Sequence, residues 1–418
     1  MHGCRIIHLI LLIGFASLPC KKMKIIAVIE ESITSGGGFN QALNAIQQMN
    51  ILSIDKFEFA VVNTNKENII HLKQLKIKSD YIKITFFDRL LSKLYTGRIW
   101  SLIFSKLKII TPFEKCLIHK DCDLVYFVEQ SSRAESLQNL NFIATVWDLC
   151  HRDQLEFPEV RNFGEFRARE LVFQNTLTRA FIVMVDSEEL ADKINLRYGV
   201  DRDRIVTMPF SPSPFLKEPQ VSDSANILKL YKLDYGYFFY PAQFWAHKNH
   251  YRIIEAVKLL RQEGTQCRVV FVGGDKGNYA FLDHIIRGYG LRKHVQSLGF
   301  IPAEHMSALY ENCQAVIMPT YFGPTNLPPL EAWLLGKPLI YSKQFSDHAG
   351  NAAILINPDD ASSIADAMKS MLDESISKKY IKNGYVRLKQ ISSIRKISEK
   401  KLFAKLLQFE QKRQCWKK

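Results

Sequence analysis

Residues 315–332 read AVIMPTYFGPTNLPPLEA, and this stretch indicates the fold class. Ala315–Met318 are apolar and typical of a buried strand, a loop rich in Gly and Pro follows, and Pro329–Leu335 have a helical pattern. A buried strand that ends in a loop and leads into a helix is the repeating unit of a parallel α/β sheet. The rest of the chain repeats this unit.

Short apolar runs alternate with longer helical patterns on both sides of this stretch. The other predicted strands are Ile25–Ile29, Phe57–Val62, Leu124–Phe127, Phe142–Val146, Phe181–Val185, Tyr237–Tyr240, Arg268–Val272 and Leu339–Tyr341. The other predicted helices are Phe39–Met49, Phe166–Thr178, Tyr251–Glu263, Tyr279–Tyr289, Pro302–Asn312, Ala361–Leu372 and Ile397–Lys412. This alternation predicts an α/β fold with parallel sheets covered on both faces.

A Pro/Ser-rich passage divides the chain. It begins as PFSPSP at residue 209 and has no clear helix or strand pattern up to about Asn226. We therefore predict a Rossmann-like domain over 23–212, a linker over 213–226 and a second Rossmann-like domain over 227–395. A last helix within 396–418 is expected to pack back on the first domain. The two domains would face each other across a cleft, where ligands bind beyond the carboxyl ends of the strands.

Composition excludes several classes of protein. The chain has 418 residues, and an apolar content of 47% is too high for a disordered protein. Its eight cysteines are scattered without a C-x-x-C pair, which argues against a zinc knuckle or a disulfide scaffold and fits a reducing compartment. The net charge of +14 is uneven, because residues 66–120 hold 12 basic and 4 acidic side chains.

Residues 1–22 allow two interpretations. The apolar run Ile6–Leu18 has the length of a signal-peptide core and is shorter than the roughly 20 residues of a spanning helix. It is either a signal or short anchor, or translation begins at Met23. The second interpretation is favoured, because the strand Ile25–Ile29 follows Met23 with no linker.

Two polar clusters lie in loops of the first half. Gly36–Gly38 separate the first strand from the first helix, where glycines allow close approach and free N–H groups favour anions. Their spacing is not G-x-G-x-x-G, and a simple tight turn is the alternative. The second cluster, Trp147, Asp148, His151 and Arg152, follows the strand Phe142–Val146. Its chemistry suits hydroxyl binding or proton transfer, and a histidine bonded within a helix start is the alternative.

Two further clusters lie in the second half. The segment YPAQFWAHKNH, residues 240–250, places Lys248 at a helix start, where a cation suits phosphate. A solvated lysine is the alternative. Glu331 lies about one turn into the helix after the Gly/Pro loop, and its carboxylate can accept two hydroxyls of a diol such as a ribose. The alternative is a favourable interaction with the helix dipole.

The order of these four clusters resembles the family-4 (group 1) retaining glycosyltransferases of the GT-B fold. The resemblance begins at Met23 and is strongest over residues 237–360, where LPPLEA at 327–332 and GKPLIYS at 336–342 match the most specific motifs. It is closest to bacterial mannosyl- and rhamnosyl-type transferases. It implies a hexosyltransferase that moves a mannose- or rhamnose-like sugar from a nucleotide-diphosphate sugar to a hydroxyl of a glycan or lipid-linked acceptor, in surface polysaccharide or lipopolysaccharide assembly. No metal or cofactor beyond this co-substrate is expected.

The resemblance also implies roles for individual residues. Lys248 matches the donor diphosphate contact, and Glu331 matches the second Glu of an E-x7-E motif that binds the ribose. Either His151 or Trp147 matches the family's N-domain active-site His. The expected catalytic set is Asp148, His151, Lys248 and Glu331. The expected donor-binding set is Gly36, Gly37, Gly38, Gln243, Lys248, Gly323, Thr325, Asn326, Leu327 and Glu331. The expected acceptor-side set is Phe39, Asn40, Trp147 and Arg152.

Two residues depart from the family pattern. Gly323 stands at the first Glu of E-x7-E, and Gln243 stands at the phosphate-binding Arg. We expect Thr325, Asn326 and the loop amides to hold the sugar instead, and Arg152 to assist Lys248. A sugar-nucleotide epimerase and a non-catalytic nucleotide-sugar-binding subunit are the alternative functions.

Residues 88–108 mix cations with aromatic and leucine side chains, as in Arg89, Lys93, Trp100 and Lys106. This composition is typical of a helix lying on an anionic membrane surface. The alternative is an ordinary helix with a solvated basic face. The expected location is cytoplasmic and peripheral to the inner membrane. Nucleic acid is not an expected partner, because no nucleic-acid motif accompanies the charge.

Overall fold

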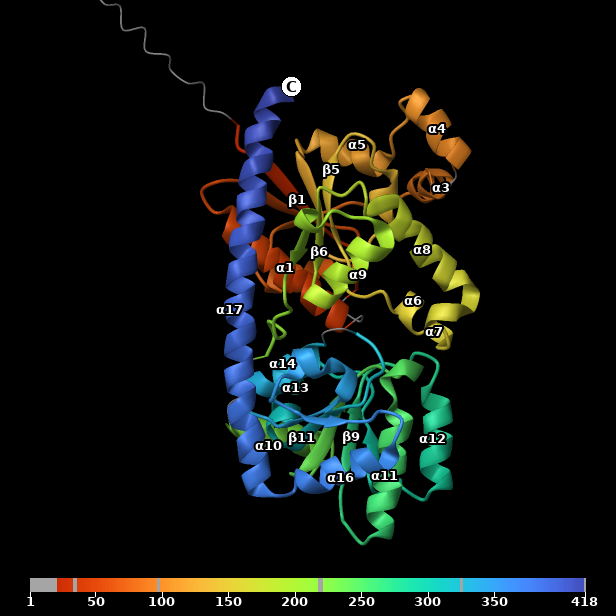
Figure 1. The fold of residues 1–418 in the computed structure, drawn as a ribbon, viewed down its shortest axis with the longest axis vertical. Coiled ribbons are helices and arrows are strands. Elements are labelled where there is room, and N and C mark those ends of the chain that lie inside the picture. Colours follow the sequence, from red (N-terminus) through yellow and green to blue (C-terminus); the bar gives the residue numbers. More distant parts are fainter. Residues whose placement is uncertain (1–20, 33–35, 96–97, 217–220, 324–325, 417–418) are drawn as a thin grey trace, which may run out of the picture.

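The computed structural model describes residues 21–32, 36–95, 98–216, 221–323 and 326–416. Figure 1 shows two domains stacked along the longest axis, with one long helix running beside both. Each domain is built on a parallel sheet with helices on both faces. The prediction of an α/β fold with two Rossmann-like domains is confirmed.

The sheet of the N-terminal domain has seven strands in the order β3-β2-β1-β4-β5-β6-β7. Every neighbouring pair is parallel, with Ile25 of β1 opposite Phe59 of β2 and Leu124 of β4. In chain order, the strands are β1 (Lys24–Ile29), β2 (Glu58–Asn63), β3 (Ser79–Tyr81), β4 (Leu124–Phe127), β5 (Asn141–Thr145), β6 (Ile182–Val185) and β7 (Ile205–Thr207).

The sheet of the C-terminal domain has six strands in the order β10-β9-β8-β11-β12-β13, also parallel throughout. The strands are β8 (Tyr237–Pro241), β9 (Val269–Val272), β10 (Val295–Ser297), β11 (Cys313–Met318), β12 (Leu339–Ser342) and β13 (Ile354–Ile356). In both sheets the strand order reverses beside the first strand of the domain. At such a point of an open α/β sheet, ligands bind in a crevice at the carboxyl ends of the strands.

Helices connect the strands and cover the sheets. Those of the N-terminal domain are α1 (Gly37–Ser53), α2 (Asn68–Gln74), α3 (Phe86–Tyr95), α4 (Arg98–Lys106), α5 (Pro112–His119), α6 (Cys150–Asp153), α7 (Pro158–Arg161), α8 (Glu165–Thr176) and α9 (Glu188–Tyr198). The others are α10 (Val221–Leu230), α11 (His250–Gln262), α12 (Tyr279–Gly288), α13 (Ala303–Glu311), α14 (Leu327–Leu334), α15 (Ser346–Ala349), α16 (Ala361–Ser370) and α17 (Glu374–Arg413).

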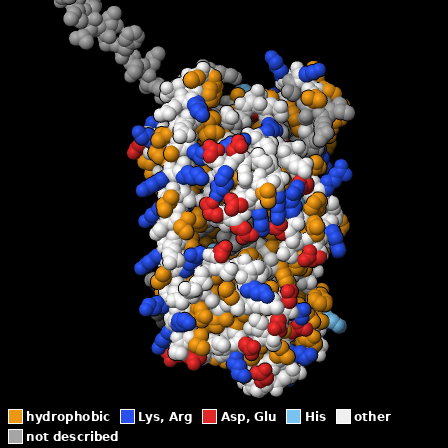
Figure 2. Space-filling model, in the orientation of Figure 1, with side chains coloured by type: hydrophobic (Ala, Val, Ile, Leu, Met, Phe, Trp, Pro, Cys, Tyr) orange, Lys and Arg blue, Asp and Glu red, His pale blue; other side chains and the backbone are white. Residues whose placement is uncertain are grey.

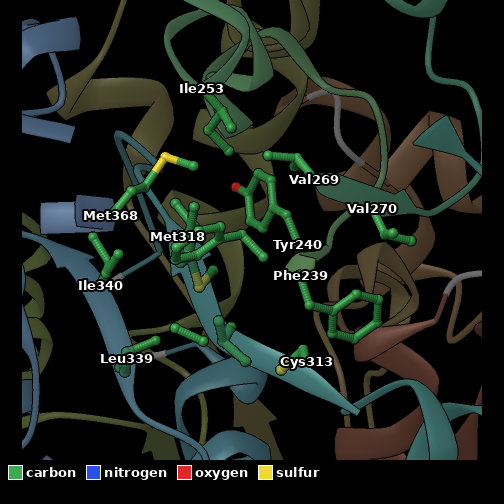
Figure 3. Close-up of a cluster of buried hydrophobic side chains, with 14 of the residues drawn as sticks. Phe239, Tyr240, Ile253, Val269, Val270, Cys313, Met318, Leu339, Ile340 and Met368 are labelled. Atoms are coloured by element: carbon green, nitrogen blue, oxygen red, sulfur yellow. The ribbon is translucent and has the colours of Figure 1, made fainter. Parts of the chain in front are cut away.

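The core of the C-terminal domain lies between its sheet and the helices on either face (Figure 3). Phe239 and Tyr240 of β8 are fully buried there with Ile253 of α11 and Met318 of β11. The Tyr240 hydroxyl donates a hydrogen bond of 2.8 Å to the backbone carbonyl of Lys248. The core therefore fixes the backbone of a predicted site residue directly.

The last helix, α17, joins the cores of the two domains. It is continuous over 40 residues, whereas the sequence predicted a separate helix at Ile397–Lys412. Ile391 belongs to the C-terminal core, while Leu402, Leu406 and Phe409 belong to the N-terminal core.

The helix holds 12 basic and 3 acidic residues, and Figure 2 shows Lys and Arg side chains along its edge of the molecule. The charge is therefore not concentrated in residues 66–120 alone.

The predicted linker and the N-terminal segment differ in how much of them the structure describes. The predicted linker 213–226 is not free of regular structure, because α10 already begins at Val221 and its residue Leu228 joins the C-terminal core. Of residues 1–22, only 21 and 22 are among the described residues, so the two interpretations of this segment concern a part of the chain outside them. Within the described residues, no helix is both long and apolar enough to cross a membrane.

Candidate functional site

The glycine loop of the N-terminal domain lies directly against the C-terminal domain. A Cβ atom on Gly37 would come within 3.4 Å of Leu327 Cδ1, at the start of α14. A Cβ on Gly38 would lie 3.3 Å from the Trp147 ring, which follows β5. The loop thus brings together the first turn of α1, Trp147 and the start of α14, as the predicted cleft requires.

Lys248 lies at the centre of this meeting point. It ends the short 3-10 helix Ala246–Lys248 after β8, and its Nζ lies 3.3 Å from Asn326 Oδ1. Burial lowers the pKa of Lys248 to about 8, while Cys150, Asp148 and Glu159 act in the opposite direction. Among the described residues, no carboxylate forms an ion pair with Lys248. A half-buried cation without a paired anion can accept the charge of a phosphate.

Asn326 occupies the space that a side chain at position 323 would need. Gly323 has φ of +99°, a conformation that L side chains rarely adopt, and a Cβ there would lie 2.9 Å from Asn326 Oδ1. The Asn326 amide donates to the Gly323 carbonyl at 2.9 Å and to the Tyr341 hydroxyl at 3.0 Å. A glutamate at position 323 would therefore be strained in this backbone conformation, and Asn326 is a polar side chain that contacts Lys248. Thr325 lies outside the described residues.

The start of α14 offers few backbone donors. Pro328 and Pro329 occupy its first turn and have no N–H group. The backbone amides that were expected to hold the sugar therefore cannot include these two positions.

Glu331 lies one turn further along α14 and is nearly fully buried. Its Oε2 accepts a hydrogen bond of 2.5 Å from the Tyr310 hydroxyl, and the backbone of Ser213 in the linker also bonds to the carboxylate. Burial raises the pKa of Glu331, and these two hydrogen bonds oppose the rise. The linker thus covers the residue that was expected to hold the ribose.

His151 is not at the cleft surface. Its side chain is fully buried, its ring lies between Phe166 and Phe173, and its Nε2 is 3.2 Å from Glu170 Oε2. Burial lowers the pKa of His151. In this structure His151 is buried within the N-terminal domain and contacts two aromatic rings there, and its role in positioning the sugar stays a prediction. Of the two alternatives for this role, Trp147 is the residue beside the glycine loop.

Arg152 is also committed to Glu170. Its Nε lies 2.8 Å from Glu170 Oε2, its Nη2 bonds the other carboxylate oxygen, and its guanidinium stacks over the Tyr198 ring at 4.8 Å. This bidentate pair lowers the pKa of Glu170 to about 2. The guanidinium thus already has an ionised partner in this structure, and its assistance to Lys248 stays a prediction.

Asp148 forms an ion pair that the sequence did not predict. Its Oδ1 accepts from Arg169 Nη2 of α8 at 2.6 Å and from the Cys150 amide at 3.0 Å. Burial would raise the pKa of Asp148, but Arg169 and the amide keep it below its usual value. Asp148 is therefore an ionised carboxylate and not a proton donor at neutral pH.

The other residues expected at the site differ in how far they are buried and in what they contact. Phe39 is almost fully buried in the N-terminal core, and its assignment to the acceptor side stays a prediction. Asn40 is half-buried on the first turn of α1. Gln243 Oε1 accepts a hydrogen bond of 3.1 Å from the Trp245 indole, at the end of β8.

An interdomain contact beside Lys248 was not predicted from the sequence. Glu159 of α7 accepts a hydrogen bond of 2.9 Å from the backbone N–H of His247 and also bonds to its Nδ1. His247 was visible as the neighbour of Lys248 in the quoted segment. Glu159 had no sequence signal, because it lies on a four-residue helix in a long connection. Among the described residues, no cluster of three or more His, Cys, Asp or Glu could hold a metal ion.

Part of the chain matches a known protein family. The family described as "Glycosyl transferases group 1" matches residues 229–387, which contain β8, Lys248, Asn326 and Glu331. The matched segment is the C-terminal domain without the end of α17.

Curated relatives extend this similarity at low identity. The O-antigen chain mannosyltransferase B of Escherichia coli is 24% identical over 240 residues, which are 56% of this chain and 63% of the relative. The O-antigen chain mannosyltransferase RfbU of Salmonella typhimurium is 26% identical over 200 residues, which are 47% of this chain and 53% of the relative. The chain thus spans less than two-thirds of the length of these relatives.

Solved structures share the whole architecture. The crystal structure of Anabaena Alr3699/HepE in complex with UDP-glucose superposes with a TM-score of 0.69 over 91% of this chain and 100% of that chain, at 16% identity. This likeness shows a shared fold, and the predicted GT-B architecture is confirmed.

Proposed function

We propose that the protein transfers a sugar from a nucleotide-diphosphate sugar to a hydroxyl acceptor with retention of configuration, because residues 229–387 match the group 1 glycosyltransferases. A mannose- or rhamnose-like donor sugar and a role in surface polysaccharide or lipopolysaccharide assembly are part of the proposal. The names of the two O-antigen mannosyltransferases support the choice of mannose.

The observation that carries this proposal is the environment of Lys248. Its ammonium group is largely removed from water, contacts the neutral Asn326 amide and forms no ion pair among the described residues. A buried cation is costly unless an anion or polar groups satisfy it. The diphosphate of a nucleotide sugar is an anion of suitable charge, and it would lie where the two domains meet.

Charge development on the leaving group provides the chemical role. As the bond between the sugar and the diphosphate breaks, negative charge grows on the phosphate oxygen, and Lys248 would stabilise it electrostatically. We propose that this oxygen also accepts the proton of the attacking hydroxyl, so that no dedicated base is required. Glu331 would bind the ribose after the linker near Ser213 moves, and Trp147 would contact the acceptor. No metal or further cofactor is part of the proposed reaction.

A donor screen tests the proposed function. We expect GDP-mannose or dTDP-rhamnose to raise the melting temperature more than UDP-glucose, because a ligand that binds only the native state stabilises it. Transfer is then measured with and without a glycan or lipid-linked acceptor. A product that appears without acceptor would identify an epimerase, and tight binding without turnover would identify a non-catalytic subunit. Absence of binding by all three donors would contradict the proposal.

The pH dependence of donor binding should report the ionisation of Lys248. Because its pKa is about 8, the ammonium group is charged below this pH and loses its proton above it. We therefore expect donor affinity to fall by up to about tenfold per pH unit above pH 8. The measurement is calorimetric titration with a nucleotide sugar, whose diphosphate diester does not titrate in this range. In Lys248→Arg the guanidinium stays charged, so the fall should disappear; an unchanged fall would contradict the assignment.

A membrane contact through α3 and α4 is a further part of the proposal, together with a cytoplasmic location at the inner membrane. Figure 1 shows the two helices standing apart from the sheet, on the side away from α17. Asp88, the one acidic residue of the pair, is buried and accepts from the Phe113 amide. The exposed side chains are apolar or basic: Phe86, Phe87, Leu90, Trp100, Leu102, Arg89, Lys93 and Lys106. Such a surface suits anionic lipid.

Vesicle flotation tests this surface. We expect the protein to float with phosphatidylglycerol vesicles, less so at high salt, and not with pure phosphatidylcholine. The variant Phe86→Ser/Phe87→Ser/Trp100→Ser should lose most of this binding. Phe163→Ser, which removes another fully exposed aromatic ring, should not change it. Binding that survives the triple variant and depends instead on the lysines of α17 would show that this surface is not the membrane contact.

A further inference from the structure

The contact between Glu159 and His247 joins the two domains at the edge of the donor site. Glu159 lies on α7. Figure 1 shows this helix at the end of the N-terminal domain that faces the C-terminal domain. Both side chains are 9% exposed. One carboxylate oxygen of Glu159 accepts from the His247 backbone N–H at 2.9 Å and bonds to the His247 ring at Nδ1.

The protonation state of this pair follows from its surroundings. Burial lowers the pKa of His247 to about 4, so the imidazole is neutral at neutral pH. The hydrogen bonds from His247 keep the pKa of Glu159 below its usual value against the effect of burial. An ionised carboxylate can only accept hydrogen bonds, so Nδ1 must carry the imidazole proton. The contact thus fixes both the tautomer and the orientation of the ring.

His247 in turn supports the loop that follows β11. Its carbonyl accepts from the Tyr321 amide at 2.9 Å and from Thr320 Oγ1 at 3.3 Å. Its ring stacks on Phe322 with centroids 3.7 Å apart and an interplanar angle of 15°. Phe157, two residues before Glu159, adds ring contacts with Tyr321 at 5.2 Å and Phe322 at 5.5 Å.

This support continues to the donor-binding side chains. Phe322 precedes Gly323, whose carbonyl accepts from the Asn326 amide, and Asn326 Oδ1 lies 3.3 Å from Lys248 Nζ. Lys248 directly follows His247 in the chain. A continuous set of hydrogen bonds and ring contacts therefore connects the N-terminal domain to Lys248 and to Asn326.

We infer that Glu159 is a positioning residue: it orders His247 and the loop 320–323, and thereby places Lys248 and Asn326 for the donor diphosphate. The part of this inference that concerns the diphosphate rests on the proposed function.

Hydrogen–deuterium exchange of the ligand-free protein tests the ordering directly. In Glu159→Ala, we expect faster exchange in peptides that contain His247 and Tyr321. The His247 amide loses its acceptor, and the Tyr321 amide donates to a His247 carbonyl that Glu159 no longer holds in place. Glu159→Gln keeps an oxygen that can accept from the His247 amide, so its exchange should stay close to that of the wild type. Glu156→Ala removes an exposed carboxylate of the same connection and is the matched control. Unchanged exchange in Glu159→Ala would overturn the inference.

Nucleotide binding tests the link to the donor site. The probe is whichever of GDP, UDP and dTDP binds the wild type best, and Glu159→Ala should weaken its binding by roughly tenfold to hundredfold, as loss of a charged hydrogen bond does. Glu159→Gln should restore most of the affinity. If exchange changes and affinity does not, the positioning role is overturned. If the wild type binds none of the three nucleotides while exchange still changes, the proposed function fails and the ordering of the loop by Glu159 stands.

Discussion

Lys248→Ala is expected to lower the rate of sugar transfer by about 10²- to 10³-fold, the usual effect of removing one group that stabilises a developing charge. The reason is that Lys248 is the unpaired, partly desolvated cation at the place where the two domains meet. The neighbouring Arg152 cannot replace it, because its guanidinium is paired with Glu170. The measurement is the initial rate of transfer with the donor identified by the thermal screen.

The fold should survive this substitution, so the loss can be assigned to the site. Lys248 makes no ion pair among the described residues, and the Tyr240 hydroxyl bonds to its backbone carbonyl, which alanine retains. Lys293→Ala, which removes an exposed cation of the same domain, is the control and should keep full activity. Wild-type turnover by Lys248→Ala would remove Lys248 from the proposed site.

Gly384→Ala is expected to lower the free energy of unfolding by about 1–3 kcal/mol, the usual cost of overfilling a packed interface. Gly384 lies where α17 crosses α14, and a Cβ there would come 2.5 Å from Cδ1 of Trp333. Trp333 cannot move easily, because it is buried and its indole N–H donates to the Ala352 carbonyl at 3.1 Å. The measurement is the melting temperature by scanning calorimetry.

A matched substitution separates this clash from the effect of helix propensity. Gly288 ends α12, and a Cβ there meets no atom within 4 Å. Gly288→Ala should leave the melting temperature unchanged or raise it, because alanine restricts the unfolded chain more than glycine does. If Gly384→Ala behaves in the same way as Gly288→Ala, the close approach of the two helices is not needed for stability.

The sequence predicted the central strands of both sheets and missed the edges. The four strands without a prediction, β3, β7, β10 and β13, are the four edge strands, and each has only three residues. A central strand of a parallel sheet is buried on both faces and forms a continuous apolar run, as in β4. A three-residue edge strand such as β3, with two exposed residues, has no such run.

The sequence predicted which loops carry candidate site residues. Gly37 and Lys248 had to lie at the carboxyl ends of strands, because loops that follow parallel strands meet at one edge. The sequence did not predict that His151 and Phe39, which lie near the same strand ends, have buried side chains. Neighbouring side chains on a helix point in different directions, and only the packing of the helix determines which of them are buried.

The α/β class, the two domains and the loops that are candidates for a ligand site follow from the sequence, because apolar periodicity and the order of strands and loops are local properties. Which polar groups meet follows only from the tertiary structure. Lys248 and Asn326 are 78 positions apart, Glu159 and His247 are 88 apart, and the partners of Asp148 and Arg152 lie on a separate helix. Such contacts depend on how two domains and their loops pack in space, and no spacing within one segment encodes them.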